Sequence, residues 1–121
     1  MNKLSPEQDR VINGKGTEPA FSGELLHEDR TGDFLCAQCG YLLFRSNAKF
    51  DSGSGWPSFT EPANIENIEL HTDTSHGMIR TEVTCRSCGG HLGHVFDDGP
   101  VDKGGQRYCI NSLSLGFEPD E

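Results

Sequence analysis

The order of apolar and polar residues predicts one short helix near the start of the chain, followed by many short strands. Ser5 can cap a helix whose first position is Pro6, and Gln8 stands where a capping box needs a glutamine or glutamate. Asn13 and Gly14 are expected to end this helix, because both residue types are common just after a last helical turn.

The rest of the chain favours β-structure, because short apolar and β-branched runs alternate with clusters of turn residues. The candidate strands are 34–35, 41–44, 65–70, 78–84, 91–96 and 106–117. Turn clusters separate several of them at 51–55, 74–77 and 97–100. No long repeat or linker divides the sequence, so we predict a single, mainly β domain over residues 1–121.

The composition narrows the choice of fold and partner. Fifteen glycines and six prolines favour turns over a helical bundle, and 33% hydrophobic residues allow only a modest core. The net charge of −9 argues against nucleic acid and against an anionic membrane surface, since both attract basic proteins. No apolar run could span a bilayer, and the first residues lack the apolar core of a signal peptide. We therefore expect a cytoplasmic monomer whose thiols stay reduced.

Four of the five cysteines form two matched Cys-x-x-Cys turns, Cys36 with Cys39 and Cys85 with Cys88, each followed by glycine. Zinc prefers four thiolates in a tetrahedron, and such a turn holds two sulfur atoms at the spacing that one ion needs. An alternative is two redox dithiols, but those begin a helix in a βαβ unit, which this sequence does not show. The pattern predicts a structural zinc site without an open position for catalysis.

Cys109 stands apart from these pairs, in a segment predicted to be a strand. In an extended strand Arg107, Cys109 and Asn111 share one face. The arginine can favour the thiolate, and the asparagine can hydrogen-bond a polar substrate atom or orient a histidine. The alternative is an inert cysteine, buried as a small hydrophobic residue.

Two histidines and the one tryptophan are further candidates for chemistry. His91 and His94 can supply protons beside Cys109, or they can simply face solvent on a strand. In a regular strand they point to opposite faces, unless a bulge at Gly93 turns both inward, and the sequence leaves this choice open. Trp56 lies in a Gly-rich loop, where it can form an aromatic wall for a substrate or fill the core.

Several segments together resemble the B-type methionine sulfoxide reductases, the peptide-methionine (R)-S-oxide reductases. The matching segments are 5–8, 15–18, 49–59, 75–78, 91–100 and 107–112. They cover nearly the whole chain in order, and the paired cysteines fall where the family has them. The resemblance implies two small antiparallel sheets with a short N-terminal helix, and a shallow active site away from the zinc. It also implies reduction of the R epimer of methionine sulfoxide in oxidised proteins.

The resemblance implies a role for each candidate residue. Cys109 is the nucleophile, surrounded by His91, His94 and Asn111. Substrate contacts come from Trp56, which receives the ε-methyl group, and from the supporting residues Arg107 and Asp98. Attack of a thiolate on the sulfoxide sulfur needs a proton on the departing oxygen, and it leaves a sulfenic acid on the cysteine.

One position departs from the family. Many members carry a resolving cysteine where this chain has Ser54, and a serine cannot form the disulfide. With four cysteines expected on zinc, we predict a one-cysteine enzyme whose sulfenic acid is reduced from outside. The reductant would be thioredoxin, or glutathione with glutaredoxin. The alternative, in which a zinc ligand acts as the resolving thiol, would cost much of the fold.

Two other functions fit part of the sequence. A non-enzymatic zinc-binding module explains the paired cysteines and Trp56, but it leaves Cys109 and the histidines unexplained. A cysteine hydrolase would use Cys109 with a histidine base. It also needs an oxyanion hole and a strand-to-helix nucleophile turn, and the sequence does not show such a turn.

Overall fold

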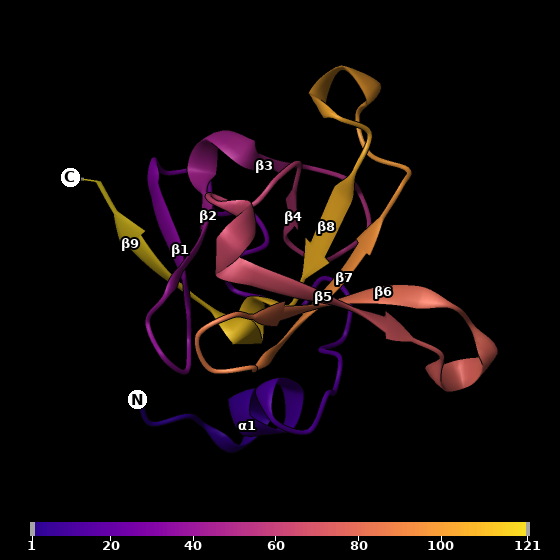
Figure 1. Ribbon diagram of the computed structural model, residues 1–121. Coiled ribbons are helices and arrows are strands. Elements are labelled where there is room, and N and C mark those ends of the chain that lie inside the picture. Colours follow the sequence, from indigo (N-terminus) through magenta and orange to yellow (C-terminus); the bar gives the residue numbers. More distant parts are fainter. Residues whose placement is uncertain (1, 121) are drawn as a thin grey trace.

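The computed structural model describes residues 2–120, apart from the side chain of His76, as two antiparallel sheets and one α-helix. The three-stranded sheet has the order β2-β1-β9, with bounds Leu42–Arg45, Gly32–Cys36 and Leu115–Pro119. The six-stranded sheet has the order β3-β4-β8-β7-β6-β5 (Figure 1). In that order its strands are Lys49–Phe50, Ser58–Phe59, Arg107–Ile110, His91–Phe96, Arg80–Cys85 and Ile68–Asp73. The predicted fold class, mainly β with two antiparallel sheets, is confirmed.

Helix α1 spans Pro6–Ile12 and is capped as predicted. The backbone N–H of Gln8 donates to Ser5 Oγ at 3.1 Å, and Ser5 N–H donates to Gln8 Oε1 at 2.9 Å. Val11 and Ile12 are buried, and the helix packs against β7 and the turn before β9. Nowhere in residues 2–120 does a helix combine the length and the apolar character that crossing a membrane requires.

The predicted strand 106–117 is wrong as a single element. It ends at Ile110, and a 3₁₀ turn at Ser112–Ser114 passes the chain to the other sheet as β9. Serine hydroxyls secure this turn, since Ser112 Oγ accepts from Leu25 N at 3.0 Å and Ser114 Oγ donates to the His91 carbonyl at 2.9 Å. Strands β3 and β4 were not predicted, because two residues are too few to show an alternating pattern.

Aromatic side chains join the two sheets. Phe44 of β2 stacks on Phe59 of β4 with ring centroids 4.3 Å apart, and Phe34 of β1 meets Phe59 edge-on at 5.1 Å. Tyr108 of β8 also packs against Phe44, with ring centroids 5.9 Å apart. One face of the six-stranded sheet is therefore used for the core, and the other face is left for polar side chains.

A β-bulge lies between β6 and β7. Val83 pairs with Gly93 and Thr84 pairs with His91, so Leu92 has no partner of its own. At the same point β7 approaches β8 closely: a Cβ added at Gly93 would lie 2.1 Å from the Cys109 carbonyl oxygen. Only glycine allows this approach without moving a backbone.

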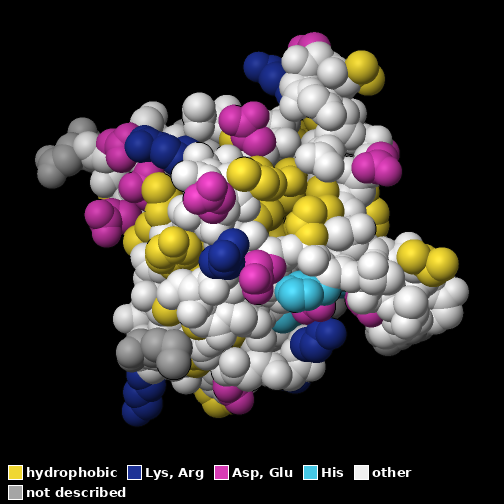
Figure 2. Space-filling view, in the orientation of Figure 1, with side chains coloured by type: hydrophobic (Ala, Val, Ile, Leu, Met, Phe, Trp, Pro, Cys, Tyr) yellow, Lys and Arg dark blue, Asp and Glu magenta, His cyan; other side chains and the backbone are white. Residues whose placement is uncertain are grey.

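Two hairpins project from the six-stranded sheet, β5–β6 and β7–β8 (Figure 1). Their tips carry exposed apolar side chains, with Ile79 85% and Val101 91% exposed. In the view of Figure 2 the acidic side chains are spread over the surface and do not gather into one patch.

Replacing Gly93 with alanine should disrupt the β7–β8 pairing. We expect Gly93→Ala to lower the free energy of unfolding by more than about 2 kcal/mol, because the methyl group meets a backbone carbonyl that cannot move freely. A matched control is Gly116→Ala in β9, where an added Cβ has no atom within 4 Å. That variant should change stability by less than about 1 kcal/mol. Urea titration measures both, and equal effects would contradict the steric argument.

Candidate functional site

A row of polar side chains crosses the exposed face of the six-stranded sheet. Glu82 pairs with His94, His94 with Cys109, and Cys109 with Ser58, across β6, β7, β8 and β4. Directly opposite residues in antiparallel strands project from the same face. The register itself therefore places His94 beside Cys109.

A pocket of about 180 Å³ opens over this row. Its lining residues are Thr17, Ser54, Trp56, Arg80, Gly93, His94, Phe96, Arg107, Cys109 and Asn111. It therefore brings together five of the predicted site residues: Trp56, His94, Arg107, Cys109 and Asn111. His91 and Asp98 lie outside its lining.

Cys109 is half-buried on β8, with a charged neighbour on the same face. Burial raises the pKa of the Cys109 thiol, while the positive charge of Arg107 and the nearby Ser54 hydroxyl oppose this rise. Arg107 is itself fixed, because its Nε and Nη2 donate to Asp98 at 2.9 and 3.3 Å. Its guanidinium also lies 4.6 Å from the centroid of the Phe96 ring. Asp98 thus contacts the arginine and not the pocket.

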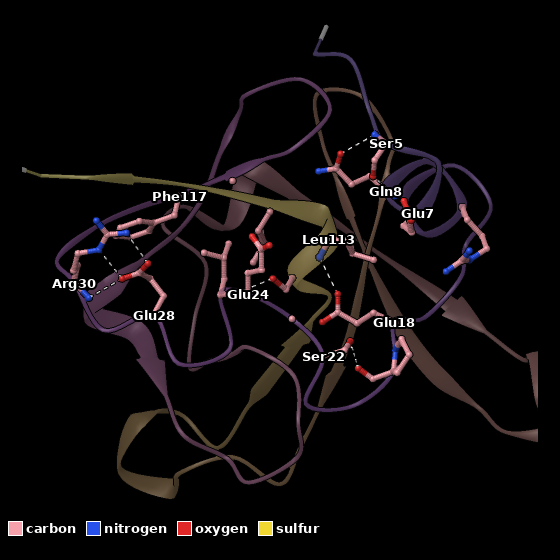
Figure 3. A pocket seen from close by; sticks show the side chains of 17 residues that line it. Ser5, Glu7, Gln8, Glu18, Ser22, Glu24, Glu28, Arg30, Leu113 and Phe117 are labelled. Atoms are coloured by element: carbon pink, nitrogen blue, oxygen red, sulfur yellow. Dashed lines mark hydrogen bonds and ion pairs between the residues drawn. The ribbon is translucent and has the colours of Figure 1, made fainter.

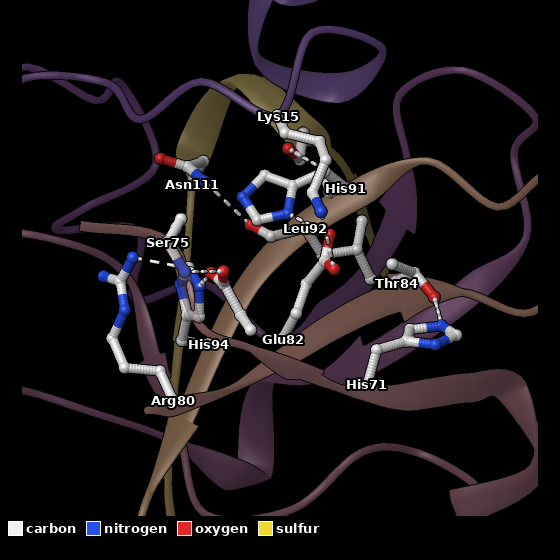
Figure 4. A network of polar contacts seen from close by, with 12 residues as sticks. Lys15, His71, Ser75, Arg80, Glu82, Thr84, His91, Leu92, His94 and Asn111 are labelled. Atoms are coloured by element: carbon white, nitrogen blue, oxygen red, sulfur yellow. Dashed lines mark hydrogen bonds and ion pairs between the residues drawn. The ribbon is translucent and has the colours of Figure 1, made fainter. Parts of the chain in front are cut away.

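His94 is bound to a buried carboxylate. Its Nε2 lies 2.8 Å from Asp73 Oδ2, and the backbone N–H of Ser75 donates to Asp73 Oδ1 at 2.9 Å (Figure 4). Arg80 reaches the same carboxylate at 3.4 Å. The hydrogen bonds from His94 and Ser75 hold the pKa of Asp73 well below its usual range.

His91 forms a second pair of the same kind. Its Nδ1 lies 2.8 Å from Glu82 Oε2, and Lys15 contacts Glu82 Oε1 at 3.3 Å (Figure 4). Burial lowers the pKa of His91, and Glu82 offsets this only in part. The two histidine rings are 5.5 Å apart, and a bulge is present as one alternative expected, but it lies at Leu92 and not at Gly93. His91 nevertheless lines a neighbouring depression, together with Lys15 and Glu82.

Trp56 and Asn111 are tied to one residue of the N-terminal loop. The indole Nε1 of Trp56 donates to the Glu18 carbonyl at 2.9 Å, and Glu18 N–H donates to Asn111 Oδ1 at 3.0 Å. Asn111 Nδ2 donates to the Leu92 carbonyl at 3.0 Å, so its amide serves the backbone and not a histidine ring. These contacts join the loop to the walls of the pocket.

A larger cavity of about 660 Å³ is lined in part by Glu18 (Figure 3). Glu18 is buried, and its Oε1 accepts from Leu113 N–H at 2.8 Å. Burial raises the pKa of this carboxyl group. None of the predicted catalytic residues lines this cavity, so the smaller pocket around Cys109 is the candidate active site.

Comparison with known proteins is decisive for the family. Residues 4–119 match the family model of the SelR domain. The peptide methionine sulfoxide reductase MsrB of Bradyrhizobium diazoefficiens is 58% identical over 117 residues, which cover 97% of this chain and 84% of that protein. The MsrB of Methanosarcina mazei is 53% identical over 118 residues, 98% of this chain and 84% of that protein. This chain belongs to the B-type methionine sulfoxide reductases.

One solved structure has a similar fold but a different sequence. The "Yippee-like" domain of Mis18 matches with a TM-score of 0.60 and 16% sequence identity, covering 76% of this chain and 99% of that domain. At this identity the likeness extends to the fold alone. The membership of this chain among the B-type reductases rests on the sequence matches and not on that likeness.

In the loop that would carry the resolving cysteine, three serine hydroxyl groups are linked by hydrogen bonds. Ser54 Oγ lies 2.8 Å from Ser52 Oγ, which in turn lies 2.7 Å from Ser58 Oγ. Gly53 and Gly55 flank Ser54 with φ of +75° and +95°, a conformation that favours glycine. This turn places the Ser54 side chain in the lining of the pocket that contains Cys109.

The four remaining cysteines of this B-type reductase form one cluster. All four Sγ atoms of Cys36, Cys39, Cys85 and Cys88 lie within 4.8 Å of one another, so they can hold a metal ion. The distance is 3.7 Å between Cys36 and Cys88 and 3.5 Å between Cys39 and Cys85. A tetrahedral site with zinc–sulfur bonds of about 2.3 Å has sulfur atoms about 3.8 Å apart, so the donor set fits. The cluster joins the ends of β1 and β6, one strand from each sheet.

Sequence reasoning missed four residues that shape the site: Thr17, Asp73, Arg80 and Glu82. Thr17 lies within the matching segment 15–18 but was not singled out there. The other three lie on β5 and β6, outside the matching segments. One signal was present, because Arg80, Glu82 and Thr84 alternate with apolar or small residues in the predicted strand. That alternation indicates a polar face on β6.

Removing the charge of Arg107 should make Cys109 less reactive at a fixed pH. Burial already holds the pKa of the thiol above its ordinary value, so thiolate accumulates only at alkaline pH, and loss of the arginine moves that pH higher. We expect Arg107→Gln to slow alkylation of Cys109 by iodoacetamide at pH 8 by about 3- to 10-fold. The exposed Arg10→Gln on α1 removes the same charge and should leave the rate unchanged. A faster reaction of Arg107→Gln would contradict this account.

Proposed function

We propose that this chain reduces the R epimer of methionine sulfoxide in proteins to methionine, with Cys109 as nucleophile. The observation that carries the proposal is the cross-strand pairing of Cys109 with His94 inside a pocket that Trp56 also lines. Curated relatives that are more than half identical over nearly the whole chain carry the name peptide methionine sulfoxide reductase MsrB. The site therefore has the nucleophile, the proton donor and the apolar wall that this reaction needs.

The reaction transfers one oxygen atom. The Cys109 thiolate attacks the sulfoxide sulfur and forms a transient sulfur–sulfur bond. The protonated oxygen then passes from the substrate sulfur to Cys109, so the sulfur–oxygen and sulfur–sulfur bonds break as the sulfenic acid forms and methionine leaves as a thioether. The substrate sulfur is reduced to a thioether and the cysteine is oxidised. The oxygen needs a proton as its bond to sulfur breaks, and we assign its delivery to His94, which lines the pocket. The His91 ring lies 5.5 Å from the His94 ring, outside the lining of the pocket.

The walls of the pocket would orient the substrate. Trp56 is half-buried and held through its indole nitrogen, so its ring can contact the methyl group of methionine sulfoxide. Asn111 fixes the adjoining backbone, and Arg107, anchored by Asp98, keeps a positive charge beside the reacting sulfur. If the pocket fixes both the methyl group and the rest of the methionine side chain, only one epimer of the sulfoxide presents its sulfur to Cys109.

The sulfenic acid would be reduced by an external thiol. Ser54 occupies the position of the resolving cysteine, and the other four cysteines belong to the cluster. Thioredoxin acting directly, or glutathione with glutaredoxin, supplies the two electrons that return Cys109 to a thiol. A partner of this kind binds only transiently, and we retain the prediction of a monomer.

We assign zinc to the four-cysteine cluster, as a structural ion. The sulfur–sulfur distances suit a tetrahedral site, and four protein ligands leave no position for substrate. The ion would stabilise the joint between the two sheets while Cys109 remains outside its ligand set.

The proposed function is tested by turnover of the separate sulfoxide epimers. With dithiothreitol as reductant, the R epimer of N-acetyl-methionine sulfoxide should be reduced at least about 100-fold faster than the S epimer, because a misplaced sulfur cannot reach the thiolate. Cys109→Ser should abolish turnover while its circular dichroism spectrum stays that of the parent chain. Equal reduction of both epimers, or full activity of Cys109→Ser, would refute the proposal.

The zinc assignment is tested by metal analysis of purified chains. The parent chain and Cys109→Ser should each contain one zinc ion. Cys85→Ser should lose it, and its free energy of unfolding should fall by more than about 3 kcal/mol because metal binding contributes directly to folding. If Cys85→Ser kept zinc and stability while Cys109→Ser lost them, the assignment of ligands would be wrong.

A further inference from the structure

The carboxylate of Asp73 is held by contacts from three residues near the pocket. Asp73 ends β5, and its Oδ2 reaches across β6 to His94 Nε2 at 2.8 Å. Ser75 N–H binds its other oxygen at 2.9 Å, and Arg80 approaches at 3.4 Å. Asp73 and His94 are each only 9% exposed, so water competes little for this contact.

The protonation state of Asp73 determines which nitrogen of His94 carries a proton. Its surrounding donors hold the pKa of Asp73 well below its usual range, so the group is ionised at any working pH. An ionised carboxylate only accepts hydrogen bonds, so His94 Nε2 must carry a hydrogen in both the neutral and the protonated ring. Proton exchange is then confined to Nδ1.

Nδ1 is also the ring nitrogen that remains available to the pocket. His94 lines that pocket opposite Cys109, and Nε2 is occupied by Asp73. Among the side chains that the structure describes, none is hydrogen-bonded to His94 Nδ1. Without Asp73 the ring could flip or change tautomer, and its transferable proton would then point away from the substrate.

We propose that Asp73 is a positioning residue for His94, fixing its orientation and tautomer so that Nδ1 delivers the proton to the sulfoxide oxygen. This inference rests on the proposed function. The step balances as before: Nδ1 gives up one proton, the sulfoxide oxygen receives it and moves to Cys109, and solvent returns a proton to Nδ1. Asp73 gains and loses none.

The similar pair of His91 and Glu82 does not share this role. Its hydrogen bond has the same length, 2.8 Å, and its carboxylate is likewise contacted by a basic residue, Lys15, but His91 lines a different depression. Both histidines are paired with a carboxylate, so the two pairs differ in position: His94 lines the pocket of Cys109 and His91 does not.

The kinetic test isolates the sulfoxide step. Parent chain and Asp73→Asn are mixed with methionine-R-sulfoxide without reductant, and methionine formation is followed over a single turnover. We expect Asp73→Asn to be slower by about 100-fold or more, the scale at which a general acid contributes. Alkylation of Cys109 by iodoacetamide should change less than about twofold, because that reaction needs no acid. Glu69→Gln, which neutralises an exposed carboxylate on the same strand, should leave both rates unchanged.

A spectroscopic test measures the tautomer of His94 directly, first in the parent chain and then in the variant. Histidine side-chain ¹⁵N spectra of the parent chain should show neutral His94 as the Nε2–H tautomer, and Asp73→Asn should introduce the Nδ1–H form. If the Asp73–His94 contact served only stability, a change in the His94 tautomer would not be accompanied by a slower single-turnover rate. A parent chain in the Nδ1–H form, or a wild-type single-turnover rate in Asp73→Asn, would overturn the inference. A parent chain that forms no methionine at all would instead refute the proposed function.

Discussion

The close approach of β7 to β8 at Gly93 is the constraint on which the site depends. Because Gly93 lacks a Cβ, the Cys109 carbonyl can occupy the space beside it, and the two strands keep a register that sets His94 opposite Cys109. The bulge at Leu92 then brings His91 to the same face. Cys109 and His94, the proposed nucleophile and proton donor, are thus positioned by backbone pairing, which is far stiffer than a surface loop.

The two faces of the six-stranded sheet have different roles: one packs in the hydrophobic core, and the other carries the polar side chains of the pocket. Phe59 and Tyr108 project into the core and meet the aromatic residues of the three-stranded sheet, while their neighbours Ser58 and Cys109 project from the opposite face, where Cys109 lines the pocket. The four-cysteine cluster joins the sheets, and none of its residues lines the pocket. The Mis18 domain has a similar fold at 16% identity. A shared fold does not by itself imply a shared reaction. In the proposed function the reaction depends on the side chains of the polar face.

Features encoded within a few residues could be predicted from sequence, and features made by distant strands could not. The Ser5–Gln8 capping box and the paired cysteines are local patterns with a direct physical meaning, and the structure contains both. The partners of the histidines, Asp73 and Glu82, lie on other strands, and only the register brings them close. The turn at Ser112–Ser114 was mistaken for strand, because its serines bond to residues of the N-terminal loop and β7 that sequence alone does not place nearby.

The central claim is that one unmetallated cysteine, without a resolving partner, takes the oxygen from the substrate. Mass spectrometry after one turnover with methionine-R-sulfoxide and no reductant tests it most directly. We predict one methionine formed per chain and the mass of one added oxygen atom on the peptide that contains Cys109, trapped as its dimedone adduct, with the four cluster cysteines unmodified. An intramolecular disulfide, or an adduct on a cluster cysteine with Cys109 unchanged, would contradict the account.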